Sequence, residues 1–310
     1  MSVLFVTGAS RGFGAEIVEK ALAAGHSVVA TARDPRAIAA RFPDAGEHLL
    51  PVALDVLDEA QAAAAVEAAV QRFGRIDVVV NNAGRGLLSA VEEASDAAAR
   101  AVFDTNVFGI LNVLRAVLPT LRAQRSGRII NLSSIGGFIG SAGWGIYCAT
   151  KFAVEGFSEA LAREVGPLGI DVVIVEPGYF RTDFLDASSL STQGTVIDDY
   201  AETAGATRQH ATDVNHAQPG DPVKAAAAIV EIASAERPPL RIQLGRDSFT
   251  AVAQKLQFVA EEQQAWRDLS VSTDHDDVTP LEPRRERSLP LEIPVNFRAV
   301  RNVRRPRRPW

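Results

Sequence analysis

The stretch Val3-Leu4-Phe5-Val6-Thr7-Gly8-Ala9-Ser10-Arg11-Gly12-Phe13-Gly14 decides the fold. Its apolar first half predicts a buried parallel strand, and the amphipathic run 15–24 that follows predicts a helix. Glycines at the turn let the backbone approach a pyrophosphate, and a helix N-terminus presents free N–H groups and the positive end of its dipole to phosphate. The spacing Gly-x-x-x-Gly-x-Gly differs from the usual dinucleotide fingerprint, so an ordinary strand-to-helix turn is the alternative for this stretch alone.

Strand-like and helical runs alternate along most of the chain. This alternation predicts an α/β fold, a Rossmann-type doubly wound parallel sheet of about seven strands with helices on both faces. Hydrophobic residues make up 47% of the 310 residues, enough for a large core. The predicted strands are residues 2–6, 27–31, 50–54, 76–80, 127–132, 171–175 and 240–244. The predicted helices are residues 15–24, 59–73, 97–121, 148–166, 222–235 and 249–265.

Three polar residues form the most informative pattern. Tyr147 and Lys151 are four positions apart, and Ser134 lies 13 positions before the tyrosine. Residues i and i+4 share a helix face, so the ammonium group of Lys151 is expected beside the phenol and to lower its pKa from about 10. A serine hydroxyl aimed at the same point can hold a carbonyl or alcohol oxygen. Together they predict proton transfer near neutral pH, although each residue alone has an ordinary packing or surface role as its alternative.

Six motifs resemble the short-chain dehydrogenase/reductase family in order and spacing. They are Thr7-Gly8-Ala9-Ser10-Arg11-Gly12-Phe13-Gly14, Asn81-Asn82-Ala83-Gly84, Asn106, Ser134, Tyr147-Cys148-Ala149-Thr150-Lys151 and Pro177-Gly178. The resemblance covers roughly residues 2–245 and is strongest to the branch of 17β-hydroxysteroid-dehydrogenase-like reductases. It implies one NAD(P)-binding oxidoreductase domain over residues 1–268, followed by a basic tail over residues 269–310.

The resemblance also implies a catalytic set of four residues: Asn106, Ser134, Tyr147 and Lys151. Tyr147 is the expected general acid for ketone reduction and the base for the reverse oxidation. Lys151 is expected to lower its pKa and to bind ribose hydroxyls, while Ser134 orients the substrate oxygen. Asn106 lies inside an otherwise apolar helix, where its amide can satisfy a kink or hold a water that links Lys151 to solvent. The family's proton relay matches the second use.

A larger set is implied for the cofactor. Asp55 is expected to bind the adenine amino group, Pro177 and Gly178 to pass under the nicotinamide, and Thr182 to bind its carboxamide. Asp55 and Asn82 equally suit turns, where they cap local backbone groups. The complete set is Gly8, Ser10, Arg11, Gly12, Phe13, Gly14, Arg33, Asp55, Val56, Asn82, Ala83, Gly84, Tyr147, Lys151, Pro177, Gly178 and Thr182.

The end of the second predicted strand bears on which cofactor is bound. NAD enzymes of this fold usually place an acid there for the ribose 2′-OH, but this strand ends without one and Arg33 follows. Arg33 and Arg11 together can clamp a 2′-phosphate, which favours NADP(H). Asp34 comes one place later, so NAD(H) stays possible, and two solvated arginines are the plain alternative.

Residues 183–220 break the alternation, because they are polar, show little periodicity and follow the sixth strand. Ligands bind outside the carboxyl ends of such strands, so this segment is a candidate lid over substrate, with a surface insertion as the alternative. The expected pocket walls are mostly apolar, which favours a hydrophobic ketone, aldehyde or alcohol. These walls are residues 85–88, Phe138, Ile139, Trp144, Tyr179 and Phe180, with Arg85 or Arg181 available for a carboxylate.

Charge and composition limit the other partners. The formal net charge is −6, but the stretch from position 281 carries nine arginines and three glutamates. A solvated tail is the simpler interpretation, and no nucleic-acid partner is expected because aromatic residues are nearly absent from it. Cys148 is the single cysteine, which excludes an intrachain disulfide and suits a reducing cytoplasm. No apolar run of membrane length and no metal-ligand spacing among the five histidines is visible, so neither a membrane nor a metal is expected.

The leading interpretation is therefore an NADP(H)-dependent carbonyl reductase or alcohol dehydrogenase. The alternatives are an NAD-dependent enzyme of the same family and a non-catalytic dinucleotide-binding sensor, although a sensor does not require a proton relay. Family members often assemble through two long helices, which here are residues 97–121 and 148–166. A homodimer or homotetramer is therefore expected.

Overall fold

The computed structural model describes residues 1–192 and 194–275. Residues Met1–Glu261 form one compact unit, and a second unit begins at Glu262. In the second unit, helix α10 (Arg267–Val271) is described. It ends inside the stretch 269–310 that was predicted as the tail. From residue 276 onward the predicted tail lies outside the described residues.

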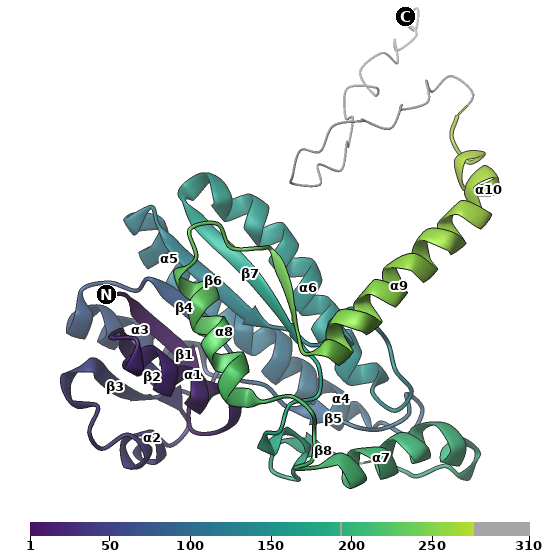
Figure 1. The fold of residues 1–310 in the computed structure, drawn as a ribbon, viewed down its shortest axis with the longest axis horizontal. Helices are drawn as coiled ribbons and strands as arrows, with labels where there is room; N and C mark the ends of the chain where they lie inside the picture. Colours follow the sequence, from purple (N-terminus) through teal and green to yellow (C-terminus); the bar gives the residue numbers. More distant parts are fainter. Residues whose placement is uncertain (193, 276–310) are drawn as a thin grey trace, which may run out of the picture. The chain divides into compact units, whose positions relative to one another are not determined.

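The first unit is built on a parallel sheet with the order β3-β2-β1-β4-β6-β7-β9 (Figure 1). Each of the seven strands coincides with a predicted one to within two residues, which confirms the predicted fold class. The order reverses between β1 and β4, and ligands bind at such a switch point in open α/β sheets. The strands are β1 (Val3–Thr7), β2 (Ser27–Ala32), β3 (Leu49–Ala53), β4 (Val78–Asn81), β6 (Gly127–Leu132), β7 (Ile170–Pro177) and β9 (Arg241–Leu244).

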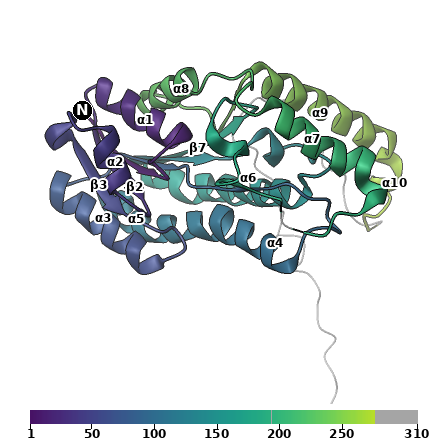
Figure 2. The same cartoon turned by 90° about the horizontal axis from the view of Figure 1, so that it is seen from below.

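Helices cover both faces of this sheet, as Figure 2 shows from the side. One core cluster joins the sheet to α3 (Glu59–Phe73), α5 (Gly109–Gln124) and α6 (Gly145–Val165). The other joins the opposite face to α1 (Gly12–Ala23) and α8 (Pro222–Ser234). Strands that are buried on both faces consist mainly of apolar residues. This is why β1, β2 and β4 could be predicted from the sequence although polar and apolar residues do not alternate along them.

The predicted helix 97–121 is in fact three elements. Helix α4 (Asp96–Phe103) leads through a π-helical turn, η2 (Asp104–Phe108), into α5. The whole run Asp96–Gln124 is long and apolar enough to span a membrane by length and composition, with a window of mean hydropathy 1.4, so the expectation that no run reaches this length was wrong. Its inner face packs into the core through residues such as Ile110, Val113 and Val117.

The segment after β7 contains more regular structure than predicted. Strand β8 (Leu190–Ser191) pairs with β5 (Gly86–Leu87), and α7 (Ala206–Val214) follows another π-helical turn, Ala201–Gly205. These elements are short and polar, and only Ala211 of α7 is buried, so no helical periodicity marks them in the sequence. Beyond β9, helix α9 runs over Arg246–Ala265, and α2 (Arg36–Arg41) follows β2.

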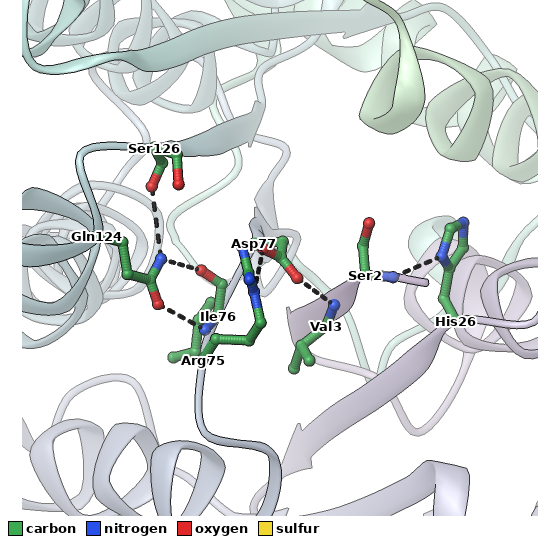
Figure 3. Close-up of polar contacts among 8 residues, drawn as sticks. All are labelled: Ser2, Val3, His26, Arg75, Ile76, Asp77, Gln124 and Ser126. Atoms are coloured by element: carbon green, nitrogen blue, oxygen red, sulfur yellow. Dashed lines mark hydrogen bonds and ion pairs between the residues drawn. The ribbon is translucent and has the colours of Figure 1, made fainter.

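A polar network, drawn in Figure 3, joins the amino ends of the central strands β1 and β4. The backbone N–H of Val3 donates to Asp77 at 2.7 Å, and Arg75 donates to the same carboxylate. The amide of Gln124 accepts from the N–H of Ile76 at 3.1 Å and donates to its carbonyl at 2.7 Å. These bonds satisfy backbone groups at the strand ends and fix the register of the two central strands.

Candidate active site

A cavity of about 750 Å³ lies at the carboxyl ends of the strands, within the size range of ligand sites. Every predicted site residue lines it except Gly14 and Asn106. The structure therefore brings together residues from the glycine loop, from the ends of β2, β3, β4, β6 and β7, and from α6.

Gly14 acts through packing. A Cβ at Gly14 would lie 2.2 Å from the carbonyl oxygen of Gly8 and 2.6 Å from Nδ2 of Asn82, so no side chain fits between α1 and the loop. Gly8 has φ +66°, a conformation that favours glycine. The amide of Asn82 donates to the carbonyls of Thr7 and Gly8 at 2.9 and 3.0 Å. The predicted structural role of Asn82 is therefore present, and α1 starts with its unpaired N–H groups near the cavity.

The catalytic candidates lie on two adjacent elements. Tyr147 and Lys151 share one face of α6, and Nζ of Lys151 lies 5.8 Å from the phenol ring centroid. The Lys151 ammonium donates to the carbonyl of Leu132 at 2.8 Å, at the end of β6. Ser134 follows β6, and its Oγ accepts the N–H of Gly136 at 3.0 Å, which caps the short turn Ile135–Gly137 (η3).

Burial dominates the protonation of this pair. It raises the pKa of Tyr147, and a hydrogen bond with Ser134 opposes the rise. Burial also lowers the pKa of Lys151 to about 8, against the opposing charge of Glu155. The expected lowering of the Tyr147 pKa by Lys151 therefore does not dominate in this structure.

Asn106 lies in the π-helical turn and is fully buried. Its amide group donates to the carbonyl of Arg85 at 2.9 Å and to Oγ1 of Thr150 at 3.0 Å, and its Oδ1 accepts the N–H of Arg85 at 2.9 Å. The side chain thus links the helix irregularity to the loop after β4 and to the residue before Lys151. This is the first of its two predicted uses, and the water relay stays a prediction.

Arg33 and Asp34, which follow β2, have different surroundings. Arg33 is exposed and lines the cavity. Asp34 binds Arg36 through both carboxylate oxygens, at 2.9 and 2.8 Å, and these hydrogen bonds lower its pKa. Asp55 lines the cavity and also accepts the N–H of Leu57 at 3.1 Å, so its predicted turn-capping role is present.

Arg11 has partners that the sequence did not reveal. Its guanidinium donates to Oγ and the carbonyl of Ser188, at 2.8 and 3.1 Å, and to Oγ of Ser189 at 2.9 Å. It therefore joins the glycine loop to the segment after β7, whereas a 2′-phosphate clamp with Arg33 was expected. No sequence signal places Ser188 and Ser189 there, because they are separated from Arg11 by more than 170 residues.

Asp247, in the first turn of α9, was also missed. It accepts the N–H of Tyr179 at 2.7 Å, and a Cβ at Gly178 would lie 2.2 Å from its carboxylate. Gly178 is therefore required for close approach at the end of β7. Thr182, two residues past Phe180 along the same cavity, caps the next turn by accepting the N–H of Phe184 at 3.4 Å.

The predicted pocket walls are partly right. Arg85, Ile139, Trp144, Tyr179 and Phe180 line the cavity, whereas Leu87 and Leu88 are core residues and Gly86 and Phe138 lie outside its lining. The ring centroids of Trp144 and Phe184 lie 5.4 and 5.6 Å from that of Tyr147. The segment after β7 adds lining residues that were not predicted: Asp183, Phe184, Leu185, Ser188, Ser189 and Gln218.

This segment is also anchored by an ion pair. Arg208 of α7 lies 2.6 Å from the buried carboxylate of Glu93. Hydrogen bonds from Arg208 and from the N–H groups of Ile197 and Ala90 lower the pKa of Glu93 to about 2.

Three residues that the sequence did not group, Asp183, Asp186 and His216, have potential ligand atoms within 4.8 Å of one another. Asp186 already binds Asn215 at 2.8 Å and His216 at 3.0 Å, so hydrogen bonding accounts for their proximity.

The doubly wound sheet, the glycine loop and the Ser134, Tyr147 and Lys151 cluster at one cavity define a dinucleotide-dependent oxidoreductase site. The sequence profile described as short chain dehydrogenase matches residues 2–192. The chain belongs to the short-chain dehydrogenase/reductase family, as its motifs predicted, and is an NAD(P)-dependent enzyme.

Individual relatives agree with this assignment. The chain is 39% identical to "Oxidoreductase BOA17" of Botryotinia fuckeliana over 87% of its own length and 98% of the relative's. It is 38% identical to the 3-ketodihydrosphingosine reductase of Bacteroides thetaiotaomicron, over 78% and 87% of the two chains. A solved short-chain dehydrogenase from Streptomyces avermitilis is 42% identical, with a TM-score of 0.79 over 88% of this chain and 98% of that one. More distant structural neighbours, 23–25% identical and solved with NAD, NADH or NADP, share the fold.

Proposed function

We propose that this enzyme is an NADP(H)-dependent oxidoreductase that interconverts a ketone or aldehyde and an alcohol on an apolar small molecule. One observation supports it most: Ser134, Tyr147 and Lys151 line the same cavity as the glycine loop and Arg33. A proton donor and a dinucleotide cradle that share one cavity provide the two components that carbonyl reduction needs.

Each residue then has a defined role. When bound, a nicotinamide cofactor would supply or accept the hydride. The Tyr147 hydroxyl gives its proton to the carbonyl oxygen in reduction and takes it back in oxidation. The Ser134 hydroxyl donates to the same oxygen as negative charge develops on it. Lys151 binds the ribose hydroxyls and provides the positive charge next to Tyr147.

The preference for NADP(H) rests on the end of β2. Arg33 is exposed at the cavity, and Asp34 is neutralised by Arg36, so the acid that favours NAD(H) is engaged elsewhere. A guanidinium group binds phosphate through charge-assisted hydrogen bonds. An NAD-dependent enzyme is the second candidate, because Arg11 is bound to Ser188 and Ser189 instead of supplementing Arg33.

The substrate class follows from the walls near Tyr147. Trp144 and Phe184 flank its ring, and Ile139 and Leu185 line the same cavity. Such walls favour an apolar body beside the carbonyl group. A relative whose name denotes reduction of a 3-keto compound supports carbonyl reduction as the direction of the reaction.

The test is turnover with a panel of apolar ketones and alcohols, followed through the absorbance of the reduced cofactor. We expect reduction by NADPH at a higher kcat/KM than by NADH. Tight NADPH binding with no turnover on any member would instead favour a non-catalytic sensor.

We also propose a homodimer or homotetramer in the cytoplasm. Phe108 of η2 and Phe152 of α6 are 53% and 47% exposed, on the elements expected to mediate assembly. Light scattering that gives the mass of a single 33.1 kDa chain would contradict this assembly.

A further inference from the structure

A buried cluster of charged residues lies directly behind the catalytic lysine. Glu155 follows Lys151 by one helical turn on α6 and is 6% exposed, and Glu176 on β7 is fully buried. Arg241 on β9 joins them: its Nε lies 2.7 Å from Oε2 of Glu155 and 3.5 Å from Oε1 of Glu176. A terminal nitrogen of Arg241 also binds Glu159, whose side chain is 42% exposed.

The cluster contains more carboxyl groups than its arginine can neutralise. Oε1 of Glu155 and Oε1 of Glu176 are both buried and accept no hydrogen bond from the described residues, although Nε of Arg241 lies 3.5 Å from Oε1 of Glu176. A proton held between the two carboxyl groups would satisfy both oxygens, because adjacent acids share a proton more readily than they both ionise. Burial raises the pKa of Glu155 to about 7, so it is ionised in the alkaline range and available to interact with Lys151 there.

Glu155 is connected to two parts of the catalytic machinery. Its negative charge raises the pKa of Lys151, in opposition to burial. It also packs under the turn that carries Ser134. A Cβ at Gly137 would lie 3.1 Å from Oε1 of Glu155 and 2.3 Å from Oγ of Ser133, so the turn rests directly on the carboxylate.

We propose that Glu155 is a positioning residue of the active site, whose carboxylate, fixed by Arg241, keeps Lys151 charged and holds the Ser134 turn in place. This inference rests on the proposed catalytic roles of Lys151 and Ser134. The charged and titratable groups that face Glu155 are Lys151 and Glu159 on α6, Glu176 on β7 and Arg241 on β9, with the hydroxyl of Ser133 from the β6 end. Glu155 is thus the carboxylate through which the cluster acts on the catalytic lysine.

The experiment is the pH dependence of alcohol oxidation by the full-length wild-type, Glu155→Gln, Glu155→Asp and Glu159→Gln proteins with NADP⁺. Removal of a negative charge makes neighbouring groups lose their protons at lower pH. The midpoint of the rise in kcat/KM should therefore move down by about one pH unit in Glu155→Gln. Glu155→Asp keeps the charge and should restore the midpoint towards the wild-type value. Glu159→Gln removes a charge from the same arginine at an exposed position and should leave the midpoint unchanged.

Two outcomes would overturn the proposal. One is a Glu155→Gln profile that superimposes on the wild type, and the other is an equal displacement in Glu155→Gln and Glu159→Gln, which would indicate a general field effect. NADPH affinity and thermal unfolding of each variant show whether it is folded. If Glu155→Gln does not fold, the profiles of Glu155→Asp and Glu159→Gln decide, and a midpoint away from its expected value in either variant counts against the proposal. Failure of the wild type to turn over any alcohol would count against the proposed function instead.

Discussion

The guanidinium of Arg11 donates a 2.8 Å hydrogen bond to Oγ of Ser188, and so ties the glycine loop to the segment that lines the substrate side of the cavity. A second bond reaches Oγ of Ser189. The carbonyl of Ser189 in turn accepts the N–H of Gly86 at 2.9 Å, next to the β5–β8 pair. Arg11 therefore holds a small, otherwise weak strand pair in place across the cavity.

Substitution of Arg11 by alanine should loosen this strand pair. We expect hydrogen exchange at the Gly86 and Leu88 amides, which donate to residues 189 and 191, to become about tenfold faster, equivalent to ~1.4 kcal/mol of local opening free energy. Arg11→Lys keeps the charge but lacks the forked donor, so it should be intermediate. Unchanged exchange at both amides in Arg11→Ala would show that the arginine does not anchor this segment.

Substitution of Arg33 by aspartate should separate the two cofactors. The introduced carboxylate repels a 2′-phosphate and accepts a hydrogen bond from a ribose 2′-OH. We expect the KM for NADPH to rise by at least about tenfold and that for NADH to change much less, since a charge-assisted phosphate contact contributes roughly 1.5–3 kcal/mol. Equal changes for the two cofactors would refute the role of Arg33.

Lys151 should destabilise the fold at neutral pH. Its pKa is lowered by burial from 10.5 to about 8, so the folded protein binds its proton less tightly than the unfolded chain does. The penalty is fully present below pH 8 and fades as the pH rises towards 10.5. The change in the free energy of unfolding caused by Lys151→Met should therefore be more favourable at pH 7 than at pH 10 by roughly 2–3 kcal/mol, because the lost bond to the Leu132 carbonyl costs the same at both pH values. Urea unfolding at the two pH values measures this, and an equal difference at both would rule out the titration of Lys151 as the cause.

Asp77 should contribute stability without contributing to activity. Asp77→Ala leaves the N–H of Val3 without its 2.7 Å acceptor at the amino end of β1, which should cost about 1–3 kcal/mol. Arg75→Ala is the control, because its side chain is 56% exposed and such ion pairs contribute ~0–1 kcal/mol. We expect kcat/KM to be unchanged in both, since neither residue lines the cavity, and Asp77 precedes the amino end of β4 whereas the cavity lies at the carboxyl ends of the strands. A loss of activity in folded Asp77→Ala would contradict that separation.

The sheet was predictable because its central strands are buried on both faces. Val3–Thr7 and Val78–Asn81 are continuous apolar runs whose burial leaves few alternatives to a central parallel strand. The catalytic residues were predictable for a related reason: Tyr147 and Lys151 are four residues apart on one helix, so local geometry alone places them together.

Features that depend on distant parts of the chain could not be predicted in this way. Arg11 binds residues more than 170 positions away, and Asp247 reaches Gly178 from α9. The π-helical turn at Asn106 arises where its side chain binds the loop at Arg85, a contact with no local signature. The protonation of Tyr147 was also misjudged, because burial outweighs the neighbouring ammonium and only the fold determines burial.

The central claim is that Tyr147 transfers the proton, and the most direct measurement compares wild type with Tyr147→Phe. The ring keeps its contacts with Trp144 and Phe184, so only the hydroxyl is lost. We expect kcat for reduction of the best ketone to fall at least about a hundredfold, the usual contribution of a general acid, while the dissociation constant of NADPH stays within about twofold. Turnover retained at the wild-type rate by folded, NADPH-binding Tyr147→Phe would contradict the account.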